Sequence, residues 1–403
     1  MNSEKLRYVD TTEARGGAVE CRAAPPKRIG RIAFVVTGLE CGGAEMMLLR
    51  LLSHLDRSAV SPVVISLHGA GSLSADLSDL GVPVHELDWK RPIHTPRAAR
   101  ALMSAISSVE PDLIQGWMMH GSLAAHLANL ASRRRVPVLW NMRHSLHDVE
   151  YERVTTKTVI RLLRFLSPAS ARIIYNSHVV ARQHERLGFD SSRTVVIPNG
   201  FDCDRFRPRL ECRATARAAL DIPASAPLIG LIARVHPTKD HRNFFDAAKR
   251  LVAKGCPAHF VLVGRGTDGP AIADQIAVRS LGGRVHTLGE RTDTPEIMAA
   301  LDLATSSSRA EAFPNVVGEA MACGVPCVVT DVGDSARLVG ETGRVVPRTD
   351  PIALSDAWLE LLSLPPHARE RMGHAARHRI VTHFSVQGVI ARYESLYREF
   401  LDE

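Results

Sequence analysis

The chain lacks any hydrophobic run long enough to cross a bilayer. No apolar stretch reaches the roughly 18–20 residues that a transmembrane helix needs. The first 27 residues mix acidic and basic side chains and have no apolar core of the kind that a secretory signal contains. We therefore expect residues 1–27 to form a disordered tail and the rest of the chain to fold without a membrane span.

Cysteine is scarce, with seven residues in 403. An odd number without scaffold-like spacing argues against a disulfide framework, so we predict reduced thiols and a cytoplasmic protein. Cys323 and Cys327 have the spacing of a ligand pair. One ends a predicted helix and the other begins a predicted buried strand, which favours two small buried residues over a metal site.

The chain also lacks the usual glycine fingerprints of nucleotide binding. The first predicted strand, residues 29–37, runs into Gly42-Gly43-Ala44-Glu45, which is neither Gly-x-Gly-x-x-Gly nor a Walker loop. No acidic residue follows about 20 positions later, so a NAD-dependent dehydrogenase is not favoured. A Gly-Gly turn between a strand and a helix nevertheless lets backbone approach a phosphate closely.

What the chain does contain is a regular alternation of strands and helices. At 403 residues, with 45% hydrophobic and 23% charged residues, it suits two globular domains of roughly 150–200 residues each. Alternation predicts parallel sheets with right-handed crossovers, an α/β fold of Rossmann-like type. The predicted strands of the first domain are 29–37, 62–67, 82–87, 112–117, 137–141, 172–175 and 194–197.

The second domain is organised around the stretch from Glu311 to Glu319. A buried strand over 301–305 leads into Ser306-Ser307-Ser308, and Pro314 suits the first position of a helix that ends at Gly324. Backbone N–H groups at this helix start form a ready anion site, supplied by Phe313, Asn315 and Val316. Two carboxylates flanking an anion site suit a nucleotide-sugar, although the bare spacing alone would favour two solvated surface glutamates.

Glu311-x7-Glu319, followed by Ala-Met-Ala-Cys-Gly-Val-Pro-Cys-Val, resembles the donor-site signature of the retaining glycosyltransferases of family 4. The resemblance spans about Arg28 to Leu401. It implies the GT-B architecture, in which two Rossmann-like domains face each other across a cleft and a C-terminal helix crosses back to the first domain. The amphipathic stretch 386–400 suits that helix. The implied divisions are a tail (1–27), an acceptor-side domain (28–205), a donor domain (206–385) and the crossing helix (386–403).

Arg234 and Lys239 follow the predicted strand 228–233, where a fixed and a mobile cation can clamp a diphosphate and stabilise the charge of a leaving group. We therefore expect no catalytic metal. The resemblance further implies that Glu311 and His144 contact the donor sugar and that Glu319 holds the ribose. It also puts the Gly42-Gly43 loop and the Gly264 turn beside the diphosphate and the nucleotide. His120 and His147 also follow strand ends, and their roles stay open.

The function that follows is retaining transfer of a sugar from a nucleoside-diphosphate donor, most readily a UDP-sugar, to a glycan or lipid-linked hydroxyl acceptor in surface polysaccharide assembly. The donor is a substrate, and no separate cofactor or nucleic-acid partner is expected. The alternatives are a nucleotide-sugar epimerase of the same architecture and a non-catalytic nucleotide-sugar-binding module. Basic residues over 153–166 are either a solvated helix face or a contact with the acidic inner face of a membrane.

Overall fold

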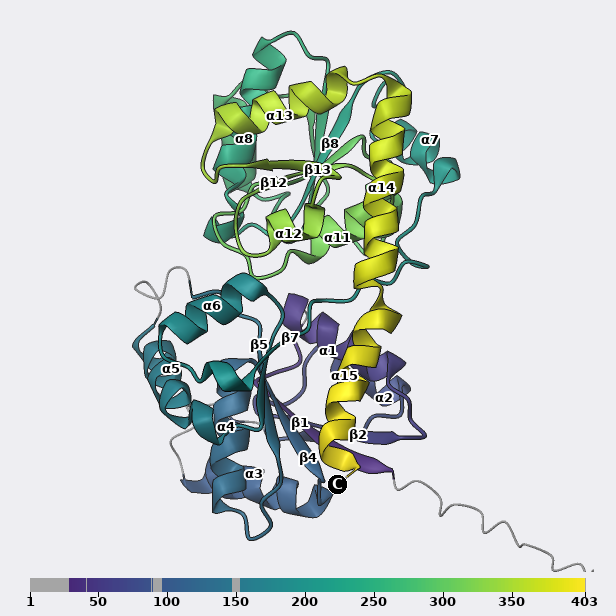
Figure 1. The fold of residues 1–403 in the computed structure, drawn as a ribbon. Coiled ribbons are helices and arrows are strands. Elements are labelled where there is room, and N and C mark those ends of the chain that lie inside the picture. Colours follow the sequence, from purple (N-terminus) through teal and green to yellow (C-terminus); the bar gives the residue numbers. More distant parts are fainter. Residues whose placement is uncertain (1–28, 41, 88, 90–95, 147–152, 403) are drawn as a thin grey trace, which may run out of the picture.

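The computed structural model describes residues 29–402 apart from 41, 88, 90–95 and 147–152. The predicted tail and His147 therefore lie outside the described residues. Figure 1 shows two α/β domains, one stacked on the other, joined along one side by a pair of C-terminal helices. Within the described part of the chain, no helix is both long and apolar enough to cross a membrane.

The N-terminal domain is built on a seven-stranded parallel sheet. Its strands carry continuous apolar runs because helices cover both faces of the sheet. The strands are β1 (Gly30–Val36), β2 (Val60–Ser66), β3 (Val84–Glu86), β4 (Leu113–Trp117), β5 (Val138–Met142), β6 (Arg172–Tyr175) and β7 (Thr194–Val196), in the order β3-β2-β1-β4-β5-β6-β7. The helices are α1 (Gly43–His54), α2 (Ser74–Asp79), α3 (Pro96–Val109), α4 (Met118–Ala131), α5 (Val154–Leu166) and α6 (His178–Arg186).

The C-terminal domain repeats this plan with six parallel strands. They are β8 (Leu228–Ile232), β9 (His259–Val263), β10 (Val285–Thr287), β11 (Leu303–Ser306), β12 (Cys327–Thr330) and β13 (Gly343–Val346), in the order β10-β9-β8-β11-β12-β13. The helices are α7 (Leu210–Ala219), α8 (His241–Ala253), α9 (Pro270–Val278), α10 (Thr294–Ala299), α11 (Asn315–Ala322), α12 (Ser335–Val339), α13 (Pro351–Ser363) and α14 (Pro366–Phe384).

The last helix, α15 (Val386–Leu401), leaves the C-terminal domain and packs on the N-terminal one (Figure 1). Its apolar stripe is buried in the same core cluster as the side chains of β1. Two tyrosine hydroxyls bond buried amides there: Tyr397 donates to Gln115 Oε1 at 2.6 Å, and Asn141 Nδ2 donates to the Tyr393 oxygen at 2.9 Å. The α/β fold class, with two Rossmann-like domains and a crossing C-terminal helix, is confirmed.

One local prediction needs correction. Pro314 is not the first helical residue but the N-cap of α11, because its ψ of 105° keeps it extended. Directly after β4, Met118 takes a positive φ of 62° and opens α4, whose first turn contains His120. The Ala- and Arg-rich stretch that opens the C-terminal domain forms α7, as expected from the high helix propensity of those residues.

Candidate active site

Two helix N-termini, one from each domain, face each other between the sheets. Helix α1 begins after Gly42 and helix α11 begins after Pro314, and among the described residues no side chain caps either start. Asn315 Nδ2 lies 3.4 Å from the carbonyl oxygen of Gly43, which fixes how close the two ends are. The first-turn N–H groups and the positive ends of two helix dipoles therefore point into one cleft, an arrangement that favours an anion.

Lys239 and Glu311 meet at the edge of this cleft. Lys239 ends a short 3₁₀ turn after β8, and its Nζ lies 2.5 Å from Glu311 Oε1. Ser308 Oγ donates to the same carboxylate oxygen at 2.7 Å. Both side chains are mostly shielded from solvent. Lys239, the cation predicted for the diphosphate, and Glu311, the carboxylate predicted for the sugar, thus form one hydrogen-bonded pair.

Arg234 leaves the end of β8 as an exposed side chain. Glu45 lies in the first turn of α1, and burial raises the pKa of its carboxyl above the ordinary value. The positive charges of Arg143 and Arg234 oppose that rise. A carboxylate from the N-terminal domain thus faces one cation from each domain. Glu45 was not among the predicted site residues, although it lies only two residues after the Gly-Gly turn.

Gly264 packs the turn after β9 against the start of the Arg234 loop. Its φ of 138° is available to glycine, and a Cβ there would lie 2.5 Å from the carbonyl of Ala233 and 2.8 Å from the amide of Arg234. Its own amide donates to the Gly289 carbonyl at 2.7 Å. Glycine is therefore required for the two loops to pack this closely at the carboxyl ends of β8 and β9.

Glu319 is buried and ion-paired to the other domain. Arg50, two turns into α1, brings its Nη2 to 2.5 Å from Glu319 Oε1 and its Nη1 to 3.4 Å from the Gly200 carbonyl. Sequence analysis missed Arg50, because one arginine on an amphipathic helix carries no local signal.

Arg143 is the centre of a polar network that crosses the domain junction. Its guanidinium is buried, lies 5.0 Å from the centre of the Trp117 ring, and donates to Asn199 and, at 3.1 Å, to Asn141. Burial lowers the pKa of Arg143 from its ordinary value. Asn199 Nδ2 in turn donates to Asn315 Oδ1 at 2.5 Å, so the network ends at the start of α11.

His144, the predicted sugar contact, follows Arg143 and is half-buried on the N-terminal side of the cleft. Burial lowers the pKa of His184, and the neighbouring His144 adds to that lowering. The Phe313 side chain is committed to the C-terminal core, with its ring centre 6.2 Å from that of Phe201 and 5.7 Å from that of Phe384. Only the backbone of Phe313 remains for a ligand, while Val316 is half-buried at the helix start.

Asp334 makes a second polar contact between the domains. This carboxylate accepts hydrogen bonds from Ser177 Oγ at 2.7 Å, from the His178 amide at 2.9 Å and from the Val179 amide at 3.0 Å. It comes from the loop after β12, and it caps the N-terminus of α6. The acidic side chain at this position therefore serves the domain interface.

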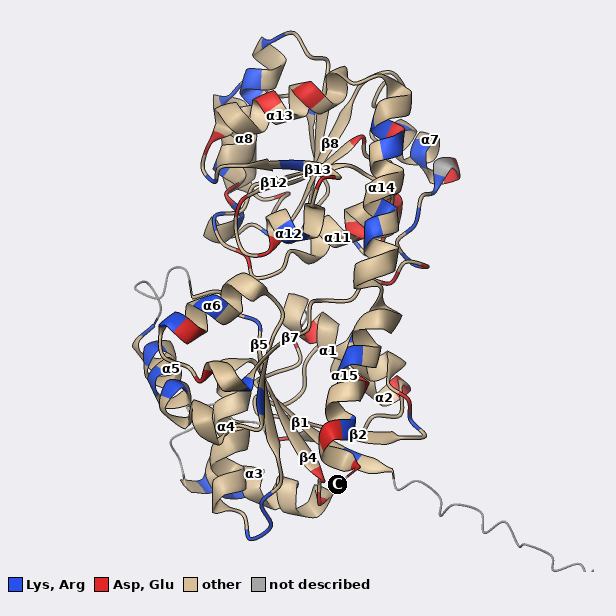
Figure 2. Ribbon diagram, in the orientation of Figure 1, with Lys and Arg blue, Asp and Glu red and all other residues tan. Residues whose placement is uncertain are grey.

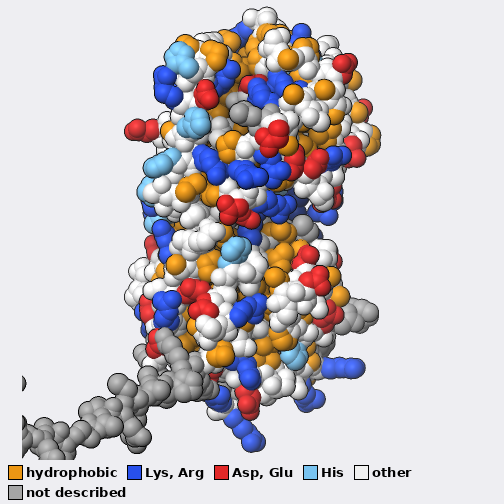
Figure 3. Space-filling model, turned by 90° about the vertical axis from the view of Figure 1, so that its right-hand side faces the viewer, with side chains coloured by type: hydrophobic (Ala, Val, Ile, Leu, Met, Phe, Trp, Pro, Cys, Tyr) orange, Lys and Arg blue, Asp and Glu red, His pale blue; other side chains and the backbone are white. Residues whose placement is uncertain are grey.

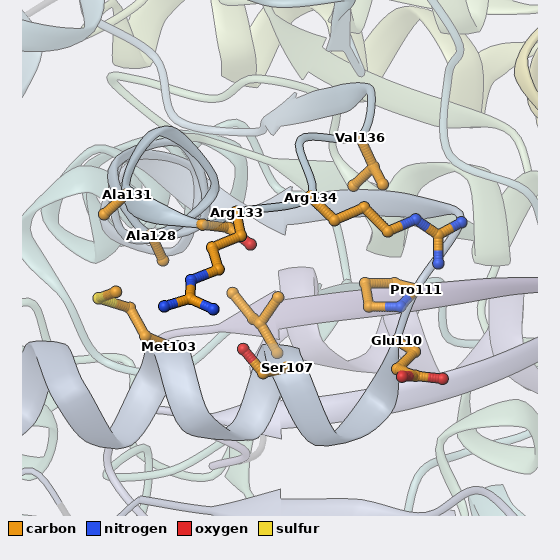
Figure 4. A pocket seen from close by; sticks show the side chains of 11 residues that line it. Met103, Ser107, Glu110, Pro111, Ala128, Ala131, Arg133, Arg134 and Val136 are labelled. Carbon is orange, nitrogen blue, oxygen red and sulfur yellow. The ribbon is translucent and has the colours of Figure 1, made fainter.

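A cavity of about 390 Å³ lies elsewhere, between α3 and α4 (Figure 4). Pro111 and Val136 in its wall lie two residues before the starts of β4 and β5, so the cavity lies at the amino ends of the strands. Parallel α/β sheets bind ligands at the carboxyl ends. We therefore place the candidate site in the interdomain cleft. Among the described residues, no group of three or more His, Cys, Asp or Glu side chains is placed to hold a metal.

The chain resembles known proteins in both sequence and structure. The LpsB mannosyltransferase of lipopolysaccharide core biosynthesis in Rhizobium meliloti is 30% identical over 234 residues, which cover 55% of this chain and 66% of LpsB. A D-inositol 3-phosphate glycosyltransferase of Mycobacterium avium is 25% identical over 421 residues, covering 95% of this chain and 97% of that protein.

Two solved structures share the fold. The HepE protein of Anabaena in complex with UDP matches with a TM-score of 0.80 and 23% identity, covering 92% of this chain and 100% of HepE. The sucrose-phosphate synthase of Thermosynechococcus elongatus matches with a TM-score of 0.76 and 22% identity, covering 92% of this chain and 99% of the synthase.

Two family models match the chain, one in each domain. The model described as Glycosyltransferase Family 4 matches residues 41–205, and the model described as Glycosyl transferases group 1 matches residues 226–364. Together they cover about three quarters of the chain, including both uncapped helix starts. The chain belongs to the glycosyltransferases of family 4.

Proposed function

We propose that this glycosyltransferase moves a sugar from a UDP-sugar to a hydroxyl acceptor with retention of anomeric configuration. The observation that carries the proposal is the pair of uncapped helix starts, at Gly43 and Asn315, that face each other beside Lys239. Their N–H groups and dipoles suit a diphosphate, which is the part common to all nucleotide-sugars. UDP is the nucleotide in the HepE complexes, which supports it as the carrier here.

We assign the donor's parts to the two domains as follows. The diphosphate lies between the helix starts, with Arg234 and Lys239 as its cations. The sugar lies toward Glu311 and His144, and the ribose toward Glu319. Backbone contacts come from Gly42, Gly43, Gly264, Phe313, Pro314, Asn315 and Val316.

Lys239 carries the step from binding to chemistry. Its Nζ is paired with Glu311 at 2.5 Å, and a diphosphate entering the cleft offers it a second, doubly charged partner. In a front-face reaction the bond from the anomeric carbon to the diphosphate oxygen breaks while the acceptor oxygen bonds the same face of that carbon. The acceptor's proton passes to the departing phosphate oxygen, and Lys239 stabilises the charge on the diphosphate without a metal ion.

The acceptor in this proposal is a glycan or a lipid-linked sugar, in agreement with the name of LpsB, which acts in lipopolysaccharide core biosynthesis. Two alternatives share the cleft: an epimerase, which would release a rearranged sugar without an acceptor, and a binding module, which would turn nothing over. Rearranged sugar in acceptor-free reactions would support the first. Tight donor binding with neither hydrolysis nor transfer would support the second.

We further propose that α5 contacts an acidic membrane surface, at the inner face of the membrane. Its outer side exposes Val154, Leu162 and Phe165, with exposed fractions of 78%, 44% and 81%, beside the exposed Arg161 and Arg164 (Figure 2). Large apolar side chains flanked by arginines suit the boundary between lipid headgroups and acyl chains.

We do not assign the membrane contact to the basic band on the face that carries α7 and α14 (Figure 3). Described arginines of this region are engaged within the chain: Arg209 bonds Glu296, and Arg377 bonds three backbone carbonyls. We therefore assign the membrane contact to α5.

Vesicle sedimentation tests the membrane contact. Vesicles containing 30% phosphatidylglycerol should retain the wild-type protein, and neutral phosphatidylcholine vesicles should not. Phe165→Ser and Arg161→Gln should each weaken retention. Val278→Ser is the matched control, because Val278 is 79% exposed but lies on α9 of the other domain. Equal retention of all variants would contradict the assignment.

The donor assignment is tested by calorimetry with UDP-, GDP-, ADP- and dTDP-sugars in the presence of EDTA. We expect one UDP-sugar to bind wild type and to bind Glu319→Ala more weakly. Activity should survive EDTA. A complete loss that Mg²⁺ reverses would refute the metal-free proposal, and equal binding to both proteins would remove Glu319 from the site.

A further inference from the structure

Arg50 reaches across the domain junction to a residue of the donor site. It lies on α1 of the N-terminal domain, and its guanidinium is 2.5 Å from Oε1 of Glu319 on α11. The two side chains are only 14% and 11% exposed, so water screens their attraction weakly. A buried carboxylate is costly unless it is paired, and here the partner is supplied by the other domain.

The pair leaves part of the carboxylate available. Arg50 bonds Oε1, and among the described residues no group donates a hydrogen bond to Oε2 of Glu319. The second nitrogen of Arg50 is held near the Gly200 carbonyl at 3.4 Å, so the guanidinium is anchored on both sides. Glu319 is thus kept in one orientation with one oxygen open.

We propose that Arg50 is a positioning residue for ribose recognition. It holds Glu319 so that the open carboxylate oxygen accepts a ribose hydroxyl, and it makes this recognition depend on the two domains lying together. The inference rests on the proposed function, since it takes Glu319 as the ribose contact. A carboxylate that is already ordered loses less conformational entropy when it binds a hydroxyl. The hydrogen bond therefore gives a larger preference for a nucleotide with that hydroxyl over one without it.

The test compares UDP with 2′-deoxy-UDP, which lacks the hydroxyl that the carboxylate would read. Losing one hydrogen bond to a charged group costs on the order of tenfold in affinity, so wild type should prefer UDP by about that factor. Arg50→Ala should bring the ratio close to one, and Arg50→Lys should restore part of it. Arg57→Ala is the control, because Arg57 bonds the Leu52 carbonyl within its own domain and should keep the wild-type ratio.

The ratio separates positioning from a general loss of structure. If Arg50 only held the domains together, both nucleotides would bind more weakly by the same factor and the ratio would stay at the wild-type value, which would overturn the inference. Arg50→Lys retains the charge and most of the side-chain volume, so it keeps the test usable if Arg50→Ala does not fold. A wild-type ratio of one would also overturn it.

Glu319→Ala distinguishes failure of the inference from failure of the proposed function. If Glu319→Ala removes the discrimination and Arg50→Ala does not, Glu319 reads the ribose without Arg50 and only the inference fails. If Glu319→Ala keeps the wild-type ratio, Glu319 does not read the ribose and both fail.

Discussion

Asp334 offers the most direct test of how the domains are held together. Its carboxylate is 3% exposed and accepts three hydrogen bonds, two of them from amides at the N-terminus of α6 in the other domain. Replacing a helix cap costs about 1–2 kcal/mol, and removing the negative charge from the positive end of the helix dipole adds about 0.5 kcal/mol. Asp334→Ala should therefore weaken this contact by about 2 kcal/mol, roughly 30-fold in the equilibrium between closed and open contact.

Hydrogen exchange at α6 measures that change directly. The amides of His178 and Val179 are protected by Asp334, so their exchange should accelerate by about 30-fold in Asp334→Ala. Asp334→Asn should have a smaller effect, because it keeps one acceptor oxygen and loses the charge. Asp331→Asn is the matched control: it removes the same charge from an exposed position three residues away in the same loop.

The outcome that would refute the reasoning is equal protection of the α6 amides in Asp334→Ala and wild type. It would mean that the two amides form equally stable hydrogen bonds with other acceptors, and that the Asp334 contact does not hold the two domains together. A change confined to residues around Asp334, without one at α6, would have the same meaning.

Three further predictions concern activity, pH and packing. Lys239→Ala should reduce kcat by about 10²–10³ and affect donor affinity less, since the charge it stabilises grows as the leaving group departs; an unchanged kcat would remove that role. Burial lowers the pKa of His184 from 6.5 to about 4. The pKa of His184 is lower in the folded than in the unfolded protein. Above about pH 6.5 protonation therefore does not affect the free energy of unfolding, and as the pH falls from 6.5 toward 4 protonation reduces it. Between pH 7 and pH 5 wild type should lose about 2 kcal/mol more than His184→Leu in urea unfolding, and parallel losses would contradict this. In Gly318→Ala the new Cβ would overlap the buried Phe201 ring, so we expect a loss of about 1–3 kcal/mol despite better helix propensity. Gly282→Ala, where a Cβ meets no atom within 4 Å among the described residues, should be near neutral in the same urea unfolding assay.

The fold and part of the site could be predicted because they follow from local patterns. Alternating apolar runs indicate parallel strands, and such strands end at the same edge of the sheet. The contact between Lys239 and Glu311 fits this rule, because their loops follow β8 and β11, which are neighbours in the sheet. The strand pattern and the sheet topology are therefore enough to predict that these two residues, 72 positions apart, lie close together.

The contacts between the domains could not be predicted in this way. Arg50 and Glu319 are 269 positions apart and lie on helices of different domains, and Asp334 and His178 are 156 positions apart. Whether they meet depends on how two separately folded domains are oriented, and strand periodicity and loop glycines carry no information about that orientation. Nothing in the sequence near Asp334 indicated that its side chain caps α6, because that helix belongs to the other domain.

The position of these contacts has a consequence for how the enzyme works. The covalent connections between the domains lie on one side, where Phe201 pairs with Ser385 at the joint between α14 and α15. The polar contacts between the domains lie around the cleft, and they include Glu319 and Asn315, which are also proposed donor contacts. A donor that bonds these two side chains therefore either weakens or strengthens the hydrogen bonds that hold the domains together around the cleft. The proposed donor contacts therefore predict that donor binding and domain closure are coupled through shared side chains, and we expect substitutions at Arg50 or Asn199 to alter both.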